Sequence, residues 1–375
     1  MASLLLAVEY MSASNPEEAS MRNHLVEMVV HPNSATGLDE NVIYNPALNY
    51  AENFHVSSIF DCSREMRNYS GDSDYHSLMH NVQKPMLTLN KVGALSLFAN
   101  KLLLREWIKG LVPIQKIFGF SSLLNDKSEV KRLFNIVISK IENREEFIIK
   151  PINGSESIGT LKVFHHDDDY KAIFLSAKNS ETKYTDALKV VSDYEIFEHW
   201  VSDDIMGITS GNIDSHLRHI EAGLIIQELF PHDKEQRGPT EMKYITAWGE
   251  LIFVGCRNSN DVCLGNNGEH LEGSNETATI LHDAFFHKLK KISLSLARAS
   301  TFPNLRLDFF VDIKSGKWVL NEIETLADCR SYSAYLLEHT GKFYLNGWNN
   351  KSYHTFTSQL STTLLRERLE HELEK

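Results

Sequence analysis

The residues best suited to chemistry are three carboxylates and an arginine near the end of the chain: Arg306, Asp308, Glu322 and Glu324. Polar and apolar residues alternate along 306–312, which holds Arg306 and Asp308, and along 318–324, which holds Glu322 and Glu324. Each segment therefore predicts a half-buried strand. The Lys-Ser-Gly stretch between them predicts a hairpin turn. If the hairpin is symmetric about Ser315, Asp308 faces Glu322 and Arg306 faces Glu324, and all four side chains share one face.

Carboxylates directly opposite one another in such a ladder lie about 4.5–5.5 Å apart and repel, so they require a cation. Magnesium is the natural candidate, because it takes oxygen ligands from carboxylates and completes its shell with water and phosphates. The hairpin therefore predicts a metal site at Asp308, Glu322 and Glu324. The alternative is an ordinary solvated acidic face, and a bulge or a two-residue loop would separate the pairs.

The composition is that of a globular protein with two or three packed subdomains: 375 residues, 42% hydrophobic and 23% charged. The net charge of -12 argues against a general nucleic-acid or anionic-membrane binder, since both need a basic surface. The four cysteines lack metal-ligand spacing and are sparse for a disulfide scaffold, which favours a reducing, cytoplasmic location.

No targeting or membrane segment is expected from the chain. The apolar run from Leu4 to Val8 has no basic residues before it, so it does not resemble a signal peptide. No window approaches 18 apolar residues, which argues against a spanning helix. Export by a dedicated secretion machine would leave no signal of this kind.

Apolar spacing predicts a helix over 95–111 that carries Lys101, and a second helix over 129–141. A short strand, 147–149, then ends at Lys150. The polar loop 153–159 and a strand over 160–164 follow. Such a loop can bring backbone N–H groups against phosphate oxygens, although the same residues also make a plain hairpin turn.

The second half of the chain predicts further strands after an ambiguous segment, 171–218, that holds one or two helices. A buried strand covers 224–230, and a hairpin over 242–256 carries Lys243 and Arg257 as its basic residues. The leucines of 356–375 recur at near-helical spacing. They predict an amphipathic helix that packs on the body of the protein or on a second subunit, which would make a homodimer.

The order of these parts resembles the ATP-grasp superfamily, and among its members the D-alanine–D-alanine ligases and related carboxylate–amine ligases. The resemblance is carried by Asn100-Lys101-Leu102-Leu103-Leu104, the segment from Phe147 to Gly159, Gln227-Glu228-Leu229-Phe230, Leu305–Phe310 and Leu320–Thr325. It implies an α+β fold with a nucleotide cleft between two α+β subdomains, 96–230 and 231–375. An N-terminal α/β domain, 1–95, would precede them.

The resemblance also assigns roles to residues, with ATP and Mg²⁺ as the implied cofactors. It places the ATP phosphates against Lys101 and Lys150 and under a loop that contains Gly154, Ser155, Ser157 and Gly159. It places the adenine and ribose against Gln227, Glu228, Phe230 and Glu241, and the metal on Asp308, Glu322 and Glu324. Arg306 would steady the reacting acyl group, Ser333 would contact the acceptor, and Lys243 and Arg257 would add phosphate or carboxylate contacts.

Two departures from the family pattern bear on the substrate. Glu324 stands where the family usually has asparagine, which adds a negative charge to the metal site. The family's glycine-rich turn is replaced by Leu326-Ala327-Asp328-Cys329-Arg330, which argues against a D-alanine substrate. We therefore expect an ATP-dependent ligase that joins an amino acid, peptide or similar carboxylate to an amine. The alternatives are a kinase acting on a sugar or inositol-like hydroxyl, and an inactive nucleotide-binding relative.

Overall fold

The computed structural model describes residues 100–152, 157, 159–166, 169–175, 186–206, 222–232, 238–257, 262–300, 302, 304–324, 336 and 362–375. The predicted N-terminal domain, 1–95, lies outside these residues. The chain divides into two compact units. The central unit holds residues 100–102 and the described part of 114–238, and the C-terminal unit holds 103–113 and the described part of 239–375. The predicted boundary at residue 230 falls within the central unit.

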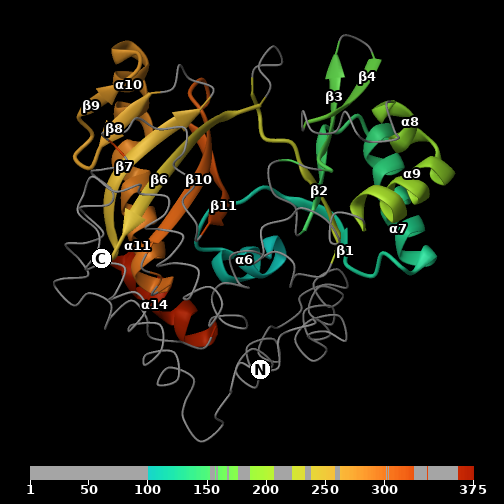
Figure 1. Ribbon diagram of the computed structural model, residues 1–375, viewed down its shortest axis with the longest axis horizontal. Coiled ribbons are helices and arrows are strands. Elements are labelled where there is room, and N and C mark those ends of the chain that lie inside the picture. The colour runs from blue at the N-terminus through green and yellow to red at the C-terminus, as the bar shows by residue number, and fades with distance from the viewer. Residues whose placement is uncertain are drawn as a thin grey trace, which may run out of the picture. The chain divides into compact units, whose positions relative to one another are not determined.

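The central unit is built on a five-stranded antiparallel sheet (Figure 1). Its strands, in spatial order, are β1 (Ile117–Ser121), β5 (Leu224–Glu228), β2 (Phe147–Pro151), β3 (Leu161–His166) and β4 (Asp169–Phe174). The strands predicted from short apolar runs are therefore present as β2, β3 and β5. Strands β1 and β4 were not expected.

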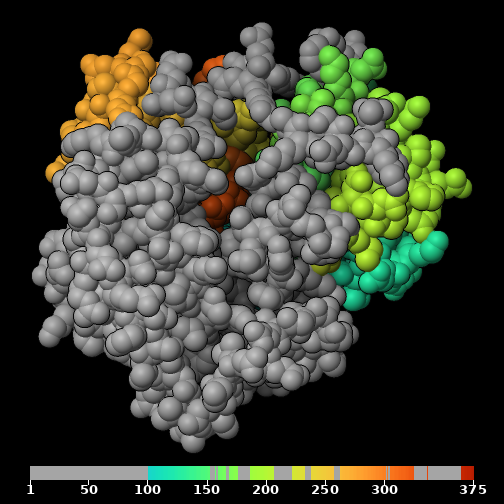
Figure 2. Space-filling view, in the orientation of Figure 1, coloured from blue at the N-terminus to red at the C-terminus, as the bar shows by residue number. Residues whose placement is uncertain are grey.

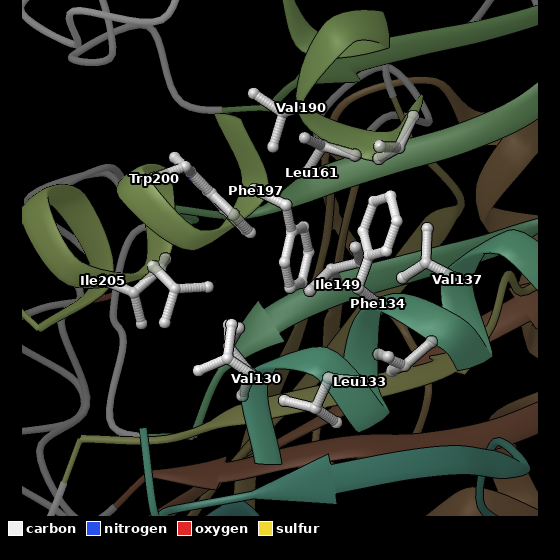
Figure 3. Close-up of a cluster of buried hydrophobic side chains, with 14 of the residues drawn as sticks. Val130, Leu133, Phe134, Val137, Ile149, Leu161, Val190, Phe197, Trp200 and Ile205 are labelled. Carbon is white, nitrogen blue, oxygen red and sulfur yellow. The ribbon is translucent and has the colours of Figure 1, made fainter. Parts of the chain in front are cut away.

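Three helices of the central unit bury one face of this sheet. They are α7 (Lys127–Glu142), α8 (Ala187–Ser192) and α9 (Tyr194–Trp200), and α9 continues into a π-helical turn, Val201–Ile205. Figure 3 shows side chains of all three helices meeting the strands in one apolar cluster: Val130, Leu133, Phe134, Val137, Ile149, Leu161, Val190, Phe197, Trp200 and Ile205. The helix expected over 129–141 and the helices expected in 171–218 are thus confirmed.

Alternation along the strands places a second set of side chains on the face away from this cluster, because successive residues of a strand point to opposite sides. The set comprises Ile148, Lys150, Lys162, Ile225 and Gln227, and cross-strand pairing aligns Ile148 with both Lys162 and Gln227, and Lys150 with Ile225. Two lysines and a glutamine therefore share the sheet face opposite these three helices.

The C-terminal unit contains a six-stranded antiparallel sheet (Figure 1). Its strands, in spatial order, are β11 (Lys317–Glu324), β10 (Asn304–Asp312), β6 (Thr240–Ala247), β7 (Glu250–Arg257), β8 (Cys263–Gly265) and β9 (His270–Glu272). Both predicted hairpins, 242–256 and 306–324, are present. Trp248 and Gly249 both have positive φ, 53° and 73°, in the two-residue turn between β6 and β7.

The helices of this unit are α6 (Lys101–Ile108), α10 (Asn275–Leu281), α11 (His287–Ser300) and α14 (Thr362–Glu374), with a π-helical turn, His282–Phe286, before α11. The first two residues of α6 belong to the central unit. Helix α11 packs against β6, β7 and β10. Tyr244 of β6 faces this helical layer, because its hydroxyl donates to the carbonyl of Phe286 at 3.2 Å. The opposite face of the sheet carries the charged residues.

The predicted C-terminal helix, α14, lies against α11 of the same chain. Leu365 and Leu369 are buried there, and Ser295 donates to the carbonyl of Glu372 at 2.9 Å. The first of the two predicted alternatives, packing on the body of the protein, is therefore observed. The pattern of α11 was not recognised in the sequence.

Figure 2 shows α8 and α9, and the segment from β8 to α10, reaching the surface on the visible face. Among the described helices, none is both long enough and apolar enough to cross a bilayer.

Candidate functional site: a buried ion cluster

The β10–β11 hairpin pairs Asp308 with Glu322 and Arg306 with Glu324, as predicted, but it reaches this register by another route. The turn occupies Ile313 to Gly316, so Asp312 pairs with Lys317 and the ladder is not symmetric about Ser315. A bulge between the Asp308 and Phe309 pairs then inserts one extra residue of β11, and this insertion restores the predicted pairs.

The bulge residue is Asn321. In a regular ladder continued from the turn, Asp308 would face Asn321, and Glu322 and Glu324 would turn toward the helical layer. The bulge is therefore the feature that places both glutamates on the charged face.

Asp308 is at the centre of this face, and its side chain is fully buried. It accepts from Arg306 twice, Nε to Oδ1 at 2.8 Å and Nη2 to Oδ2 at 2.9 Å. The ammonium of Lys243 donates to Oδ2 at 2.5 Å. Lys243 and Arg306 are also buried, with only 5% and 8% of their surface exposed. Buried charges of this kind persist only when they are paired.

Three further carboxylates complete the cluster. Glu241 forms an ion pair with Lys243 at 2.7 Å, and Glu324 forms one with Nη2 of Arg306 at 2.9 Å. Glu322 is farther away, at 3.5 Å from the same Nη2. When all are ionised, four carboxylates face two cations, so the cluster carries two uncompensated negative charges, which is the charge that one divalent cation would supply.

The pKa of Asp308 follows from its partners. Burial by itself would raise that pKa, but the charges and hydrogen bonds of Arg306 and Lys243 outweigh burial and lower it to about 2. Asp308 is thus ionised at every physiological pH.

The pKa values of two glutamates at the edge of the cluster, Glu241 and Glu324, are shifted in the opposite direction. Burial and the charge of Asp308 raise the pKa of Glu241. Burial raises the pKa of Glu324 to about 8, Glu322 and Asp308 add to the effect, and Arg306 opposes it. The side chain of Glu324 is still 38% exposed, so water screens part of this shift. Both shifts indicate that the fully ionised cluster would hold more negative than positive charge.

The donor set fits a hard divalent cation. Glu241, Asp308 and Glu322 each offer a carboxylate oxygen, and these three atoms lie within 4.8 Å of one another. Magnesium prefers oxygen ligands at 2.0–2.1 Å, and calcium accepts 2.3–2.6 Å, so a modest contraction would bring the three oxygens around one ion. This triplet differs from the predicted one in a single residue. Glu241, which was predicted to lie near a ribose, takes the place of Glu324.

The described nucleotide-binding residues predicted for the central unit lie on the sheet face opposite the helices or near the ends of its strands. The Lys101 ammonium donates to the carbonyl of Ile152 at 3.4 Å, which places it just before the predicted phosphate loop. Gln227 is buried and donates to Gln115 at 2.9 Å. Phe230 is buried as well, whereas Glu228, at the end of β5, is exposed.

Only part of the phosphate loop is described. Ser157 and Gly159 both have positive φ, 60° and 67°, and Thr160 donates to the Ser157 carbonyl at 3.1 Å, so the chain turns tightly into β3. Gly154, Ser155 and Ser333 lie outside the described residues. Arg257 occupies the position opposite Glu241 in the β6–β7 ladder.

The sequence did not indicate the contact between Lys162 and His232. The Lys162 ammonium donates to Nε2 of His232 at 2.5 Å, and Nδ1 of His232 donates to the carbonyl of Phe230 at 2.8 Å. A lysine offers only donors, which fixes this histidine tautomer. Strand alternation could have indicated that Lys162 shares a face with Lys150, but no local pattern indicated His232.

No family model matches the chain, and no curated protein matches it either. Solved structures do match it, at low similarity, and ATP-grasp ligases are among them. The ATP-grasp ligase PsnB complexed with minimal precursor is 12% identical, covers 73% of this chain and 69% of its own, and has a TM-score of 0.32.

Two further matches are ligases of D-alanine. The D-alanine–D-alanine ligase from Bacillus anthracis is 12% identical, with coverage of 72% of this chain and 77% of its own and a TM-score of 0.36. D-alanyl-alanine synthetase A from Vibrio cholerae is 13% identical, with coverage of 76% and 73% and a TM-score of 0.38.

Proposed function

We propose that this protein is an ATP-dependent carboxylate–amine ligase that works with magnesium. The observation that carries the proposal is the buried cluster in which Arg306 and Asp308 of β10 meet Glu322 and Glu324 of β11 and Lys243 of β6. Two cations surrounded by an excess of carboxylates suit a site that binds a divalent ion together with a phosphate chain.

The proposed reaction transfers the terminal phosphate of ATP to a carboxylate. The amine then attacks the acyl phosphate, the C–O bond to phosphate breaks, and phosphate leaves as the amide forms. Transfer of this kind depends mainly on positioning and charge neutralisation. Magnesium, when bound, would neutralise charge on the phosphate oxygens. Asp308, Glu322 and either Glu241 or Glu324 are the proposed residues that hold it.

Arg306 is proposed to stabilise the oxyanion that forms when the amine attacks. Its Nε and Nη2 are held by Asp308 and Glu324, which fixes the plane of the guanidinium. The remaining nitrogen, Nη1, is proposed to donate to the oxyanion. Lys101, Lys150 and Lys162 of the central unit are proposed to contact the phosphates, and Gln227 and Phe230 the adenine.

Incubation with ATP, magnesium, pooled carboxylates and pooled amines tests the proposal, read by phosphate release and mass spectrometry. We expect free phosphate and a condensed product. A product heavier by one phosphoryl group would instead identify a kinase, and nucleotide binding without turnover would identify an inactive relative. Either outcome would overturn the ligase assignment. Glu322→Gln is the matched negative control.

A further inference from the structure

The ammonium of Lys243 already occupies the place of a cation in the cluster. Its Nζ lies 2.7 Å from Oε2 of Glu241 and 2.5 Å from Oδ2 of Asp308. These two residues supply two of the three carboxylates that converge within 4.8 Å. A divalent ion binds carboxylate oxygens at about 2.0–2.6 Å, so an ion that bridged the same two oxygens would overlap the ammonium.

The acceptor capacity of Asp308 leads to the same conclusion for an ion that binds its Oδ2. A carboxylate offers about four lone-pair positions. Three are filled, one on Oδ1 by Nε of Arg306 and two on Oδ2 by Nη2 of Arg306 and Nζ of Lys243. A metal ion that coordinates Oδ2 must therefore displace one of these two cations.

Of the two, Lys243 is the easier to displace. Arg306 holds both oxygens of Asp308 with a rigid fork and also contacts Glu324. The lysine ammonium is a point charge on a flexible stem with four carbons. A displaced Lys243 would keep its charge close to the cluster, because its backbone is paired with Asp308 in the ladder.

We infer that Lys243 is a tethered counter-ion that a divalent cation must displace from Glu241 and Asp308, and that the displaced ammonium then pairs with the phosphate chain that arrives with the metal. This inference rests on the proposed function for the presence of a metal and a phosphate chain. Its consequence is that the metal alone binds weakly, whereas the metal and a polyphosphate strengthen each other's binding.

The test is a titration of the full chain with Mn²⁺, followed by electron paramagnetic resonance, without nucleotide. Lys243→Met removes the charge and keeps the length of the side chain, so we expect it to bind Mn²⁺ at least tenfold more tightly than the wild type. Inorganic triphosphate should raise the Mn²⁺ affinity of the wild type and have little effect on that of Lys243→Met. Unchanged or weaker Mn²⁺ binding by Lys243→Met would overturn the inference.

Lys288→Met is the matched control. Lys288 belongs to the same unit and lies over the ring of Trp318, 5.0 Å from its centroid, outside the cluster. Its replacement should leave Mn²⁺ affinity unchanged. Asp308→Asn should abolish Mn²⁺ binding, and if it retains wild-type affinity, the metal binds elsewhere and the inference fails.

A second measurement on the wild type covers the case in which Lys243→Met does not fold. Amine-reactive labelling followed by peptide mass mapping reports how accessible each lysine is. We expect saturating Mg²⁺ to increase labelling of Lys243 severalfold and to leave Lys288 unchanged. Labelling of Lys243 that does not respond to Mg²⁺ would contradict displacement.

These measurements read metal binding and not turnover, so they separate the two proposals. Tighter Mn²⁺ binding by Lys243→Met without any condensed product in the ligase assay would leave the counter-ion role standing and reject the ligase. A condensed product in the ligase assay, together with unchanged Mn²⁺ binding by Lys243→Met, would support the ligase and reject the counter-ion role.

Discussion

Among the residues of the cluster, Asp308 and Glu322 differ in how much folding depends on them. Asp308 compensates two buried cations at 2.5–2.9 Å, whereas Glu322 is partly exposed and contacts Arg306 at 3.5 Å only. Removal of a carboxylate from a buried network leaves uncompensated charge, and removal of a peripheral one does not. A single substitution can therefore test chemistry without testing stability.

We predict that Glu322→Gln lowers metal-dependent turnover by roughly 100-fold and changes the free energy of unfolding by less than about 1 kcal/mol. Asp308→Ala should destabilise the fold by about 3–5 kcal/mol, because Arg306 and Lys243 lose their shared partner. Urea titration and phosphate-release assays check both variants. Wild-type turnover in Glu322→Gln would remove Glu322 from the metal site.

The raised pKa values of Glu241 and Glu324 determine how these two residues make stability depend on pH. In the folded state the pKa of Glu324 is raised from 4.5 to about 8, and that of Glu241 is also raised. Between pH 4.5 and about 8 the folded protein keeps a proton on Glu324 that the unfolded chain has lost, so Glu324 makes stability fall as pH rises through this range, and Glu241 acts in the same sense. Asp308 acts in the opposite sense, but its contribution is lost only as pH falls from 3.8 through about 2.

We therefore expect the metal-free protein to melt at a lower temperature at pH 8 than at pH 6, and magnesium to restore more stability at pH 8. Differential scanning calorimetry measures both effects. Glu324→Gln removes one of the two groups and should flatten the pH dependence. Equal melting temperatures of the wild type at the two pH values would contradict the raised pKa values.

At the scale of elements, the hairpin and the sheet face position the charged side chains. The bulge at Asn321 turns Glu322 and Glu324 toward Asp308, and the β6–β10 ladder adds Lys243. In the central unit, the helices bury one face of the sheet and leave the lysines on the other. Close packing where strands meet loops maintains this arrangement.

Gly223 is one such position, directly before β5. A Cβ atom there would lie 2.8 Å from the carbonyl oxygen of Ser121 and 2.5 Å from Cδ1 of Ile152. Backbone cannot give way as a side chain can, so Gly223→Ala should destabilise the protein by about 1–3 kcal/mol. Ile152→Val should rescue little of this loss, because the contact with Ser121 remains. Denaturant unfolding of Gly223→Ala, with and without Ile152→Val, measures both effects. Full rescue by Ile152→Val would show that the contact with the Ile152 side chain alone causes the loss of stability.

At the scale of the whole molecule, Arg366 of α14 joins distant parts of the chain. Its guanidinium donates to the carbonyls of Trp107 at 3.0 Å and Lys109 at 2.9 Å, at the end of α6. The last carbonyls of an α-helix lack the donor of a following turn, and an arginine side chain is well suited to bind such groups. The last helix of the chain thereby holds α6, the helix that begins at Lys101.

We predict that Arg366→Ala costs about 1–3 kcal/mol of stability, since several charge-assisted hydrogen bonds are lost together. Arg366→Lys should recover only part of this, because an ammonium cannot reproduce the planar fork. Limited proteolysis near residue 361 and thermal melting report the effect. Wild-type melting of Arg366→Ala would show that α14 is held by apolar packing on α11 alone.

The sequence by itself was sufficient for the elements whose signal is local. Strand alternation predicted that Arg306, Asp308, Glu322 and Glu324 share a face, and helical spacing predicted α7 and α14. Both patterns depend on neighbours a few residues apart, which is why they can be read without a fold. The order of these elements also carried the ATP-grasp resemblance.

The tertiary structure alone decided which strand lies beside β10. Its pairing with β6 brings Lys243 and Glu241 to Asp308, across 65 residues of sequence in the case of Lys243. It also decided the bulge, without which the two glutamates would face the helices. Pairing between distant strands depends on how whole faces bury their apolar residues, and no local pattern records that.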